Sequence, residues 1–237
     1  MAKELNKAWE VTAHAPLEKI DDNLWAVEGK LPGAPIMRRM CIVKRSDGTL
    51  LFYHAIPLED SLLEEIRAWG KPAYLVIGHH QHMVDANALM DKLGLKLYAP
   101  KDSADKVKAR TTLTGTFEDI PADPAVSVEV LDGTKLGEPI VVVRSGGGTR
   151  VSLLFCDVVQ NNPKETVPLP LRLIGFASTS PKIVPLFRLL FMGNRVKLKA
   201  ALLKWADTPN LSRIIPFHGT ITSSNAAAAL RVAANDL

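Results

Sequence analysis

The sequence predicts an α/β protein in which two β-sheets pack face to face between outer helices, a four-layer αββα sandwich. Short apolar runs typical of strands alternate with segments of helical periodicity. The order meander, helix, strand, helix occurs in both halves of the chain, and three of the apolar runs end in histidine or aspartate. The 237 residues are 47% hydrophobic, which is enough for a sizeable core, and we expect one domain spanning 1–237.

The first half contains three strands of a meander, followed by a helix, a strand, a helix and a short strand. Strands are expected at 24–27, 40–44, 50–53, 73–77 and 96–99, and helices at 58–69 and about 85–93. Gly70 with Pro72 ends the first helix, and Gly94 ends the second. A histidine-rich segment therefore lies at the corner between a strand and a helix.

The second half repeats this plan more loosely. Strands are expected at 126–131, 139–143, 151–155 and 213–217, and helices at 185–205 and 224–235. Turn sequences such as Asp132-Gly133 separate the strands.

Polar residues suited to metal binding follow three of the expected strands. His79, His80 and His82 come just after Ile77 and are followed by Asp85; Asp157 and His218 follow two later strands. Imidazole and carboxylate groups are common ligands of zinc, iron and manganese. An aspartate after a strand is also a common helix cap or turn residue. Because strand ends in layered folds meet at one edge, we predict that Asp157 lies within reach of His82 and His218.

These residues resemble the metallo-β-lactamase superfamily, which carries an HxHxDH motif, a later strand ending in a bridging aspartate and a late histidine on an αββα sandwich. His80-Gln81-His82 resembles the HxH, Asp157 the bridging aspartate and His218 the late histidine, with Asp85 in place of the carboxylate or histidine that follows the HxH. The resemblance in strand order covers about 24–230.

The chain also departs from the family pattern. No histidine occurs between Asp85 and Asp157, where the family supplies another ligand. Six residues remain as candidate ligands, fewer than a full dinuclear site uses: His79, His80, His82, Asp85, Asp157 and His218. The expected site is therefore incomplete, either mononuclear or weakly dinuclear.

Two functions remain open. The first is a metal-dependent hydrolase of an ester, lactone, thioester or phosphoester, in which Asp85 or Asp157 orients the attacking water. Its nitrogen and oxygen ligands favour zinc, with iron or manganese as alternatives. The second is a metal-free binding or structural module that keeps the sandwich.

His54 follows another strand and has two interpretations. It resembles a replacement for the aspartate with which the family supports its metal ligands. It is also explained as a partly buried histidine hydrogen-bonded to the backbone, and the sequence favours this second interpretation.

The remaining features describe partners and location. With 29 Lys and Arg against 25 Asp and Glu, the charge is too evenly spread to predict nucleic-acid binding. No apolar run is long enough for a membrane span, and we expect a cytoplasmic protein in which Cys41 and Cys156 are buried, reduced thiols.

The apolar segment 161–185 suggests a small-molecule substrate that is apolar or bears an acyl group. The basic stretch 182–204 is either a solvated helix face or a contact for a membrane surface or anionic ligand. The sequence makes no prediction of oligomeric state.

Overall fold

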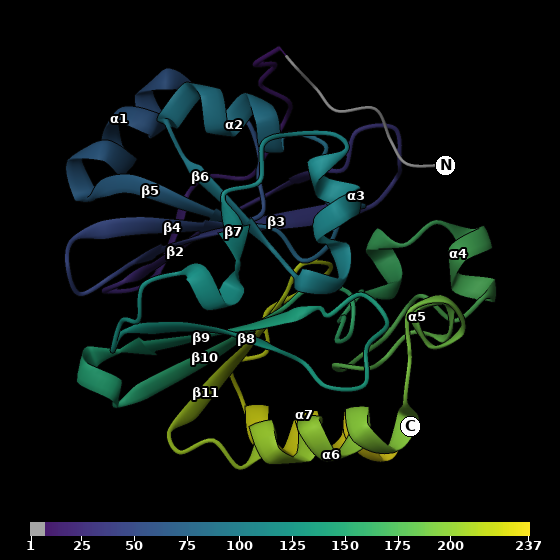
Figure 1. Cartoon of the computed structure of the whole chain (residues 1–237). Coiled ribbons are helices and arrows are strands. Elements are labelled where there is room, and N and C mark those ends of the chain that lie inside the picture. Colours follow the sequence, from purple (N-terminus) through teal and green to yellow (C-terminus); the bar gives the residue numbers. More distant parts are fainter. Residues whose placement is uncertain (1–7) are drawn as a thin grey trace.

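The computed structural model describes residues 8–237 and arranges them in four layers (Figure 1). A seven-stranded sheet and a four-stranded sheet face each other. Helices α1 and α2 cover the outer face of the first sheet, and α6 and α7 cover the outer face of the second. The predicted αββα sandwich is therefore confirmed.

The first sheet is antiparallel from β1 to β4 and parallel from β4 to β7. Its strands, in spatial as well as chain order, are β1 (Glu18–Asp21), β2 (Leu24–Lys30), β3 (Met37–Lys44), β4 (Thr49–Tyr53), β5 (Lys71–Val76), β6 (Lys96–Ala99) and β7 (Gly115–Thr116). The second sheet has the order β11-β10-β9-β8, and only its β10–β11 pair is parallel. Its strands are β8 (Val126–Val130), β9 (Pro139–Ser145), β10 (Arg150–Phe155) and β11 (Leu211–Pro216).

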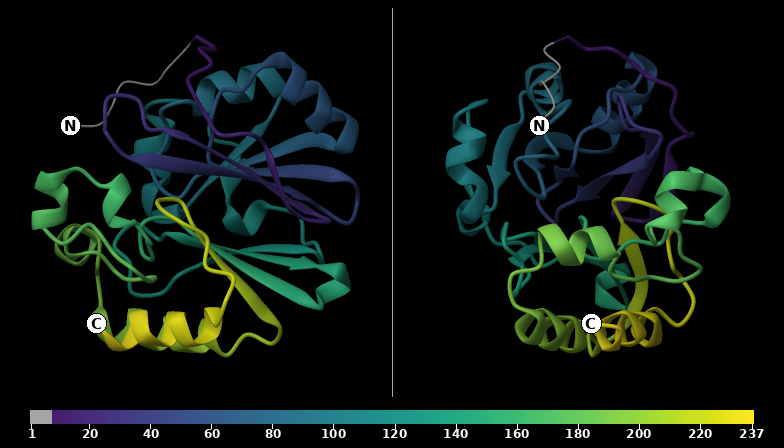
Figure 2. Two further views of the ribbon diagram at one scale, coloured as in Figure 1. Left: turned by 180° about the vertical axis from the view of Figure 1, so that it is seen from behind. Right: turned by 90° about the vertical axis from the view of Figure 1, so that its right-hand side faces the viewer.

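The α-helices differ in length and position. They are α1 (Asp60–Trp69), α2 (Ala86–Leu93), α3 (Ala104–Lys108), α4 (Leu169–Leu173), α5 (Pro185–Leu190), α6 (Arg195–Ala206) and α7 (Ala226–Asn235). The short helices α4 and α5 lie at one end of the sandwich, beyond the sheets (Figure 2).

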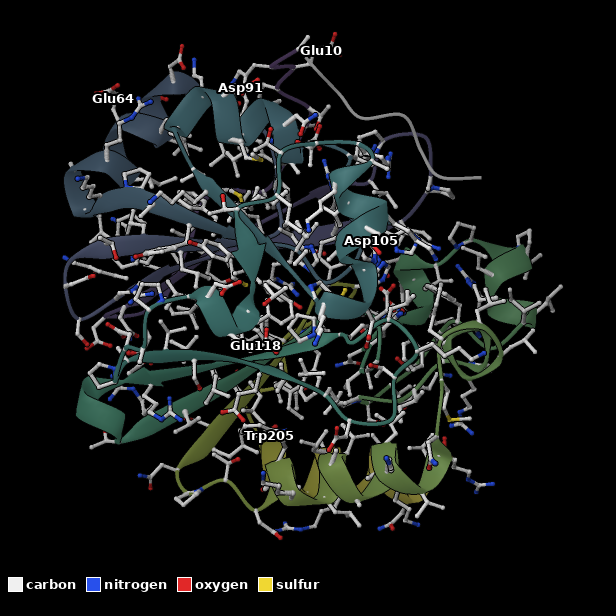
Figure 3. All side chains as sticks on the ribbon, viewed as in Figure 1. Glu10, Glu64, Asp91, Asp105, Glu118 and Trp205 are labelled. Carbon is white, nitrogen blue, oxygen red and sulfur yellow. The ribbon has the colours of Figure 1, made fainter. Side chains whose placement is uncertain are left out.

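The central strands are apolar on both faces because each face is covered by another layer. In β3, Met40 and Ile42 pack in the cluster that includes helix α1, whereas Cys41 and Val43 pack in the cluster between the two sheets. This alternation follows from the two-residue repeat of a strand. Side chains fill the space between the layers, while Glu64 and Asp91 on the outer helices point away from the sheets (Figure 3).

The expected helix over 185–205 is interrupted in the structure. Helix α5 ends at Leu190 and α6 begins at Arg195. The backbone N–H groups of Gly193 and Asn194 both donate to the carbonyl of Gly133, and the Asn194 side chain caps α6 by accepting from the N–H of Lys197. These bonds draw the connection onto the turn before β9 and stop a continuous helix.

Two further findings concern expectations from the sequence. Cys41 and Cys156 are free and buried, as predicted. No helix within residues 8–237 is long and apolar enough to cross a membrane.

Asp21 links the two sheets and provides a first test of the fold. Its carboxylate accepts from Arg150 at 2.9 and 2.6 Å and from Arg213 at 2.7 Å. The side-chain hydrogen bond from Arg150, which outweighs the opposing effect of burial, holds the pKa of Asp21 well below its ordinary value. We predict that Asp21→Asn lowers the free energy of unfolding by about 1–2 kcal/mol at pH 7, measured with urea.

The pH dependence of this loss has a defined sign. A carboxylate with a lowered folded-state pKa stabilises the protein fully above its unfolded pKa, about 4, and loses that contribution as the pH falls. The difference between wild type and Asp21→Asn should therefore shrink between pH 5 and pH 3. The exposed Asp91→Asn is the control and should leave stability unchanged at both values. A difference that stays constant with pH would show that the ion pair is not its source.

Candidate metal centre

Three strand ends bring the candidate residues to one edge of the sandwich. His79 follows β5 in the first sheet, and Asp157 and His218 follow the parallel strands β10 and β11 in the second. Phe155 pairs with Pro216, so the chain leaves both strands at the same level, two residues before Asp157 and His218 respectively. This is also the end of the molecule at which α4 and α5 lie (Figure 2).

Asp157 is the centre of this cluster. Its Oδ2 lies 2.8 Å from Nε2 of His82 and 3.1 Å from Nε2 of His79. Its Oδ1 lies 3.5 Å from Nε2 of His218. The predicted approach of Asp157 to His82 and His218 is therefore confirmed. Burial alone would raise the pKa of Asp157, but the charge of His82 and the hydrogen bonds from His79 and His82 bring it well below its ordinary value.

His218 is held in one tautomer by the backbone. Its Nδ1 donates to the carbonyl of Met37 at 2.6 Å, because a carbonyl can only accept. Burial lowers the pKa of His218 to about 4, so the ring is neutral at pH 7 and its Nε2 carries a lone pair. This lone pair faces Oδ1 of Asp157, an atom with no hydrogen-bond partner in residues 8–237. Two acceptors thus face each other, an arrangement that a cation would stabilise.

His79 is arranged differently. Its Nδ1 accepts from the backbone N–H of Gln81 at 3.2 Å, which places the ring proton on Nε2. That Nε2 donates to Oδ2 of Asp157. Burial lowers the pKa of His79 to about 4, so this ring is also neutral. In this tautomer, His79 orients the aspartate and does not offer a lone pair to an ion.

Glu138 is a buried carboxyl group beside the cluster that the sequence did not reveal. Its Oε2 accepts from the backbone N–H groups of Asp157 and Val158 at 3.0 and 3.2 Å. Its Oε1 lies 3.8 Å from Nε2 of His79. Burial, followed by the charge of Asp157, raises its pKa well above the ordinary value. An acid immediately before an apolar strand is common at a surface, so no sequence signal marked this one.

Cys156 also lies at the cluster. One donor atom from each of His79, His82, Cys156 and Asp157 fits in a group whose members are within 4.8 Å of one another. Burial raises the pKa of the Cys156 thiol well above its ordinary value, so it remains a thiol in this arrangement. Its Sγ packs so closely against Gly78 that a Cβ at that position would collide with it. The sequence predicted the buried thiol but not its closeness to the other candidates.

His54 lies beside His82 and has a left-handed backbone, φ 65°. Its ring packs against Phe217, with ring centres 4.0 Å apart, and against the edge of His82 at 5.5 Å. The ring is buried, and neither nitrogen has a hydrogen-bond partner within residues 8–237. The structure therefore does not show the backbone hydrogen bond that the sequence favoured, and places His54 next to the site.

His80 and Asp85 do not join the cluster. A turn in which the N–H of His82 donates to the carbonyl of His79 directs these two rings to Asp157. His80 lies between them in sequence, and its Nδ1 is 3.4 Å from the hydroxyl of Ser103. Asp85 occupies the N-cap position of α2 and forms a buried ion pair with Arg38. Of the six expected ligands, the structure brings four together: His79, His82, Asp157 and His218.

Known structures share this fold over nearly the whole chain. The DIM-1 metallo-β-lactamase exposed to ceftazidime superimposes with a TM-score of 0.64 and 16% identity, covering 96% of this chain and 99% of that one. A metallo-β-lactamase from Pontibacter korlensis gives 0.61 and 12% identity, covering 93% and 99%. A third, from Hirschia baltica, gives 0.58 and 14%, covering 93% and 98%.

These similarities establish the class of fold. No protein-family model matches the sequence, and no curated protein is similar to it in sequence. The chain therefore has the metallo-β-lactamase fold, in a sequence that has diverged widely from those of the solved structures. Beyond its own strand ends it carries a group of four residues that could hold a metal ion: His79, His82, Cys156 and Asp157.

The ion pair of Asp85 allows a structural role to be separated from a role in metal binding. We predict that Asp85→Ala destabilises the protein by about 3–5 kcal/mol, because it leaves the Arg38 guanidinium buried without its carboxylate. Zinc bound per folded molecule, measured by calorimetry, should remain unchanged. The matched variant His80→Ala should change stability by less than about 0.5 kcal/mol. Loss of zinc with unchanged stability in Asp85→Ala would instead identify Asp85 as a ligand.

Proposed function

We propose that the protein is a metal-dependent hydrolase whose ion is held by His82, Asp157 and His218. The observation that carries the proposal is the lone pair of His218 Nε2 facing the unpartnered Oδ1 of Asp157, 3.5 Å away. Two imidazoles and one carboxylate are a donor set found in catalytic zinc sites, and they also suit iron. Zinc is our first choice, with iron or manganese as alternatives. At His82 the ion would take the place of the proton that Nε2 shares with Oδ2 of Asp157, whereas the N–H of Gln81 fixes the proton of His79 on Nε2. One ion would satisfy the donors that converge here.

The surrounding residues would hold these donors in place. A bound ion would polarise a carbonyl or phosphoryl oxygen and lower the pKa of its water towards neutrality. The carbonyl of Met37 fixes the tautomer of His218, and His79 fixes the orientation of the Asp157 carboxylate. Glu138 anchors the backbone after β10. Asp157 is the carboxylate placed to orient that water, since Asp85 is engaged by Arg38.

A cavity beside the cluster indicates the substrate class. It has a volume of about 120 Å³ and begins next to His218, because Met37 and Gly219 both line it. Its other walls are mixed: Ile36, Leu171 and Phe176 are apolar, and Glu28, Asn162 and Thr220 are polar. Apolar side chains together with a few polar groups next to the centre suit a substrate with a short acyl chain. We therefore propose esters, lactones or thioesters, with phosphoesters as the alternative. Because the described cysteines are free and buried, we propose that the protein acts in the cytoplasm.

The proposal is tested on protein prepared without a histidine tag and supplied with one equivalent of zinc. Nitrophenyl esters of increasing acyl length, a lactone series, a thioester series and a nitrophenyl phosphodiester serve as substrates. We predict hydrolysis of the acyl substrates that depends on zinc and falls at least about a hundredfold in Asp157→Asn. His80→Ala is the matched control from the same turn and should retain activity within about twofold.

Two outcomes would contradict this account. Stoichiometric zinc without hydrolysis of any class would leave a metal-binding protein of another function. Absence of zinc binding would favour the metal-free binding module, which has some structural support because His79 and His82 already donate to Oδ2 of Asp157. Hydrolysis that survives in Asp157→Asn would place the chemistry elsewhere.

A further inference from the structure

Exposed apolar side chains are concentrated in one short part of the chain. Within residues 8–237, ten large hydrophobic residues are exposed, and seven of them lie between 169 and 196. We call these seven the α4–α5 surface: Leu169, Leu173, Ile174, Leu186, Leu189, Leu190 and Val196. The most exposed are Leu173 at 79%, Val196 at 77% and Leu189 at 75%. Exposed leucines that are scattered need no explanation, whereas exposed apolar residues that gather in one patch are typical of an interaction site.

The helices present these residues on defined faces. Leu169 and Leu173 are four residues apart and share one face of α4. On α5, Leu186, Leu189 and Leu190 are exposed, whereas Phe187 is buried in the core. A Cβ on Gly175 would lie 3.0 Å from Pro185, so the end of α4 is next to the start of α5. Both helices occupy the same end of the molecule, which the right-hand view of Figure 2 faces.

Positive charge accompanies this surface. Residues 164–206 contain eight lysines and arginines and a single acid, Glu165, a net charge of +7. The whole chain has 29 basic and 25 acidic residues. Outside residues 164–206 there are therefore 21 basic and 24 acidic residues, a net charge of −3. Asp236 reaches this region from α7 and pairs with Arg188. The weakly basic chain is thus polarised along its sequence, and two of the eight cations, Lys197 and Lys204, share a pocket with Glu129 and Asp132.

A cationic pocket lies at the base of α4. It has a volume of about 440 Å³ and is lined by Lys164, Arg172, Lys182, Ser178, Thr179 and Ser180, together with Ala177. Among residues 8–237, no acidic residue lines it. Nε of Arg172 and Nζ of Lys182 donate to the carbonyls of Val167 and Ala177, which holds both cations beside the helix. Three cations and three hydroxyl groups match the charge and the acceptor oxygens of a phosphate group.

We propose that the α4–α5 surface docks the protein onto an anionic lipid membrane. The exposed leucines enter the interfacial region of the bilayer, while the surrounding lysines and arginines meet lipid phosphates. Charge favours this occupant over a second copy of the chain, because a symmetric dimer through this surface would bring two regions of charge +7 together. Docking goes beyond the proposed hydrolase function and requires no metal ion.

Docking would also bring the bilayer close to the cavity of the proposed active site. Helix α4 contributes exposed Leu169 and Leu173 to the α4–α5 surface, and Leu171 from the same helix lines the cavity beside His218.

The test is flotation of the full-length protein with vesicles of phosphatidylcholine alone or with roughly 30% phosphatidylserine. We expect binding to the anionic vesicles, weakened in 0.5 M NaCl because salt shortens the range of electrostatic attraction. The double variant Leu173→Asp/Leu189→Asp tests the apolar side chains, with Val11→Asp, an exposed valine that precedes β1, as its control. Arg195→Glu/Lys197→Glu tests charge, with Lys71→Glu/Lys96→Glu, at the starts of β5 and β6, as its control.

Each test variant should lose at least about tenfold in vesicle affinity, and each control should stay within about twofold. All variants should keep the wild-type thermal midpoint within a few degrees, because every substituted side chain is exposed. Equal binding to neutral and anionic vesicles, no binding to either, or equal losses in tests and controls would overturn the proposal. A second result would also overturn it: a dimer in sedimentation analysis that dissociates in Leu173→Asp/Leu189→Asp, together with no vesicle binding. The occupant of the surface would then be a second copy of the chain.

Discussion

The buried carboxylate of Asp157 is the constraint on which the site depends. Removing an ionised carboxylate from water is costly unless hydrogen bonds or positive charge compensate for it. Here, His79 and His82 satisfy one carboxylate oxygen, and the other faces the lone pair of His218. Asp157 follows a strand of the second sheet, whereas His79 and His82 follow a strand of the first, so the compensation requires the sheets to meet at this edge.

Glu138 strengthens this constraint. The charge of Asp157 disfavours a second ionised carboxyl group in the same buried setting. The lowered pKa of Asp157 and the raised pKa of Glu138 assign the charge to Asp157 and the proton to Glu138. Because Oε2 of Glu138 accepts two backbone N–H groups, its proton belongs on Oε1, which faces His79. The neutral glutamic acid thus fixes the backbone of Asp157 without adding a second negative charge.

Much of the fold follows from the sequence because its pattern is local. The apolar runs that become β3, β5, β10 and β11 are buried on both faces, and glycines such as Gly94, with φ 68°, end helices as expected. Strand β7 has only two residues, and the break between α5 and α6 depends on the carbonyl of Gly133, which is about 60 positions away. Neither feature leaves a periodic signal, so neither was predictable.

The site was predictable in its location but not in its full membership. Strand ends identified His79, His82, Asp157 and His218, because the carboxyl ends of these strands share one edge. The choice between His79 and His80 depends on the direction of one turn, and the burial of Asp85 at the start of α2 depends on its ion pair with Arg38 of β3. Glu138 and Cys156 belong to the site because segments that are distant in sequence pack together there. Nothing in their local sequence indicates this position.

The most direct measurement is anomalous X-ray diffraction at the zinc absorption edge from crystals equilibrated with zinc at pH 7.5. The account predicts one strong peak at bonding distance from Nε2 of His82, Nε2 of His218 and a carboxylate oxygen of Asp157, with Nδ1 of His218 still bonded to Met37. A map without a peak at this position, in crystals that show zinc elsewhere on the molecule, would contradict the assignment of these three residues as a metal centre.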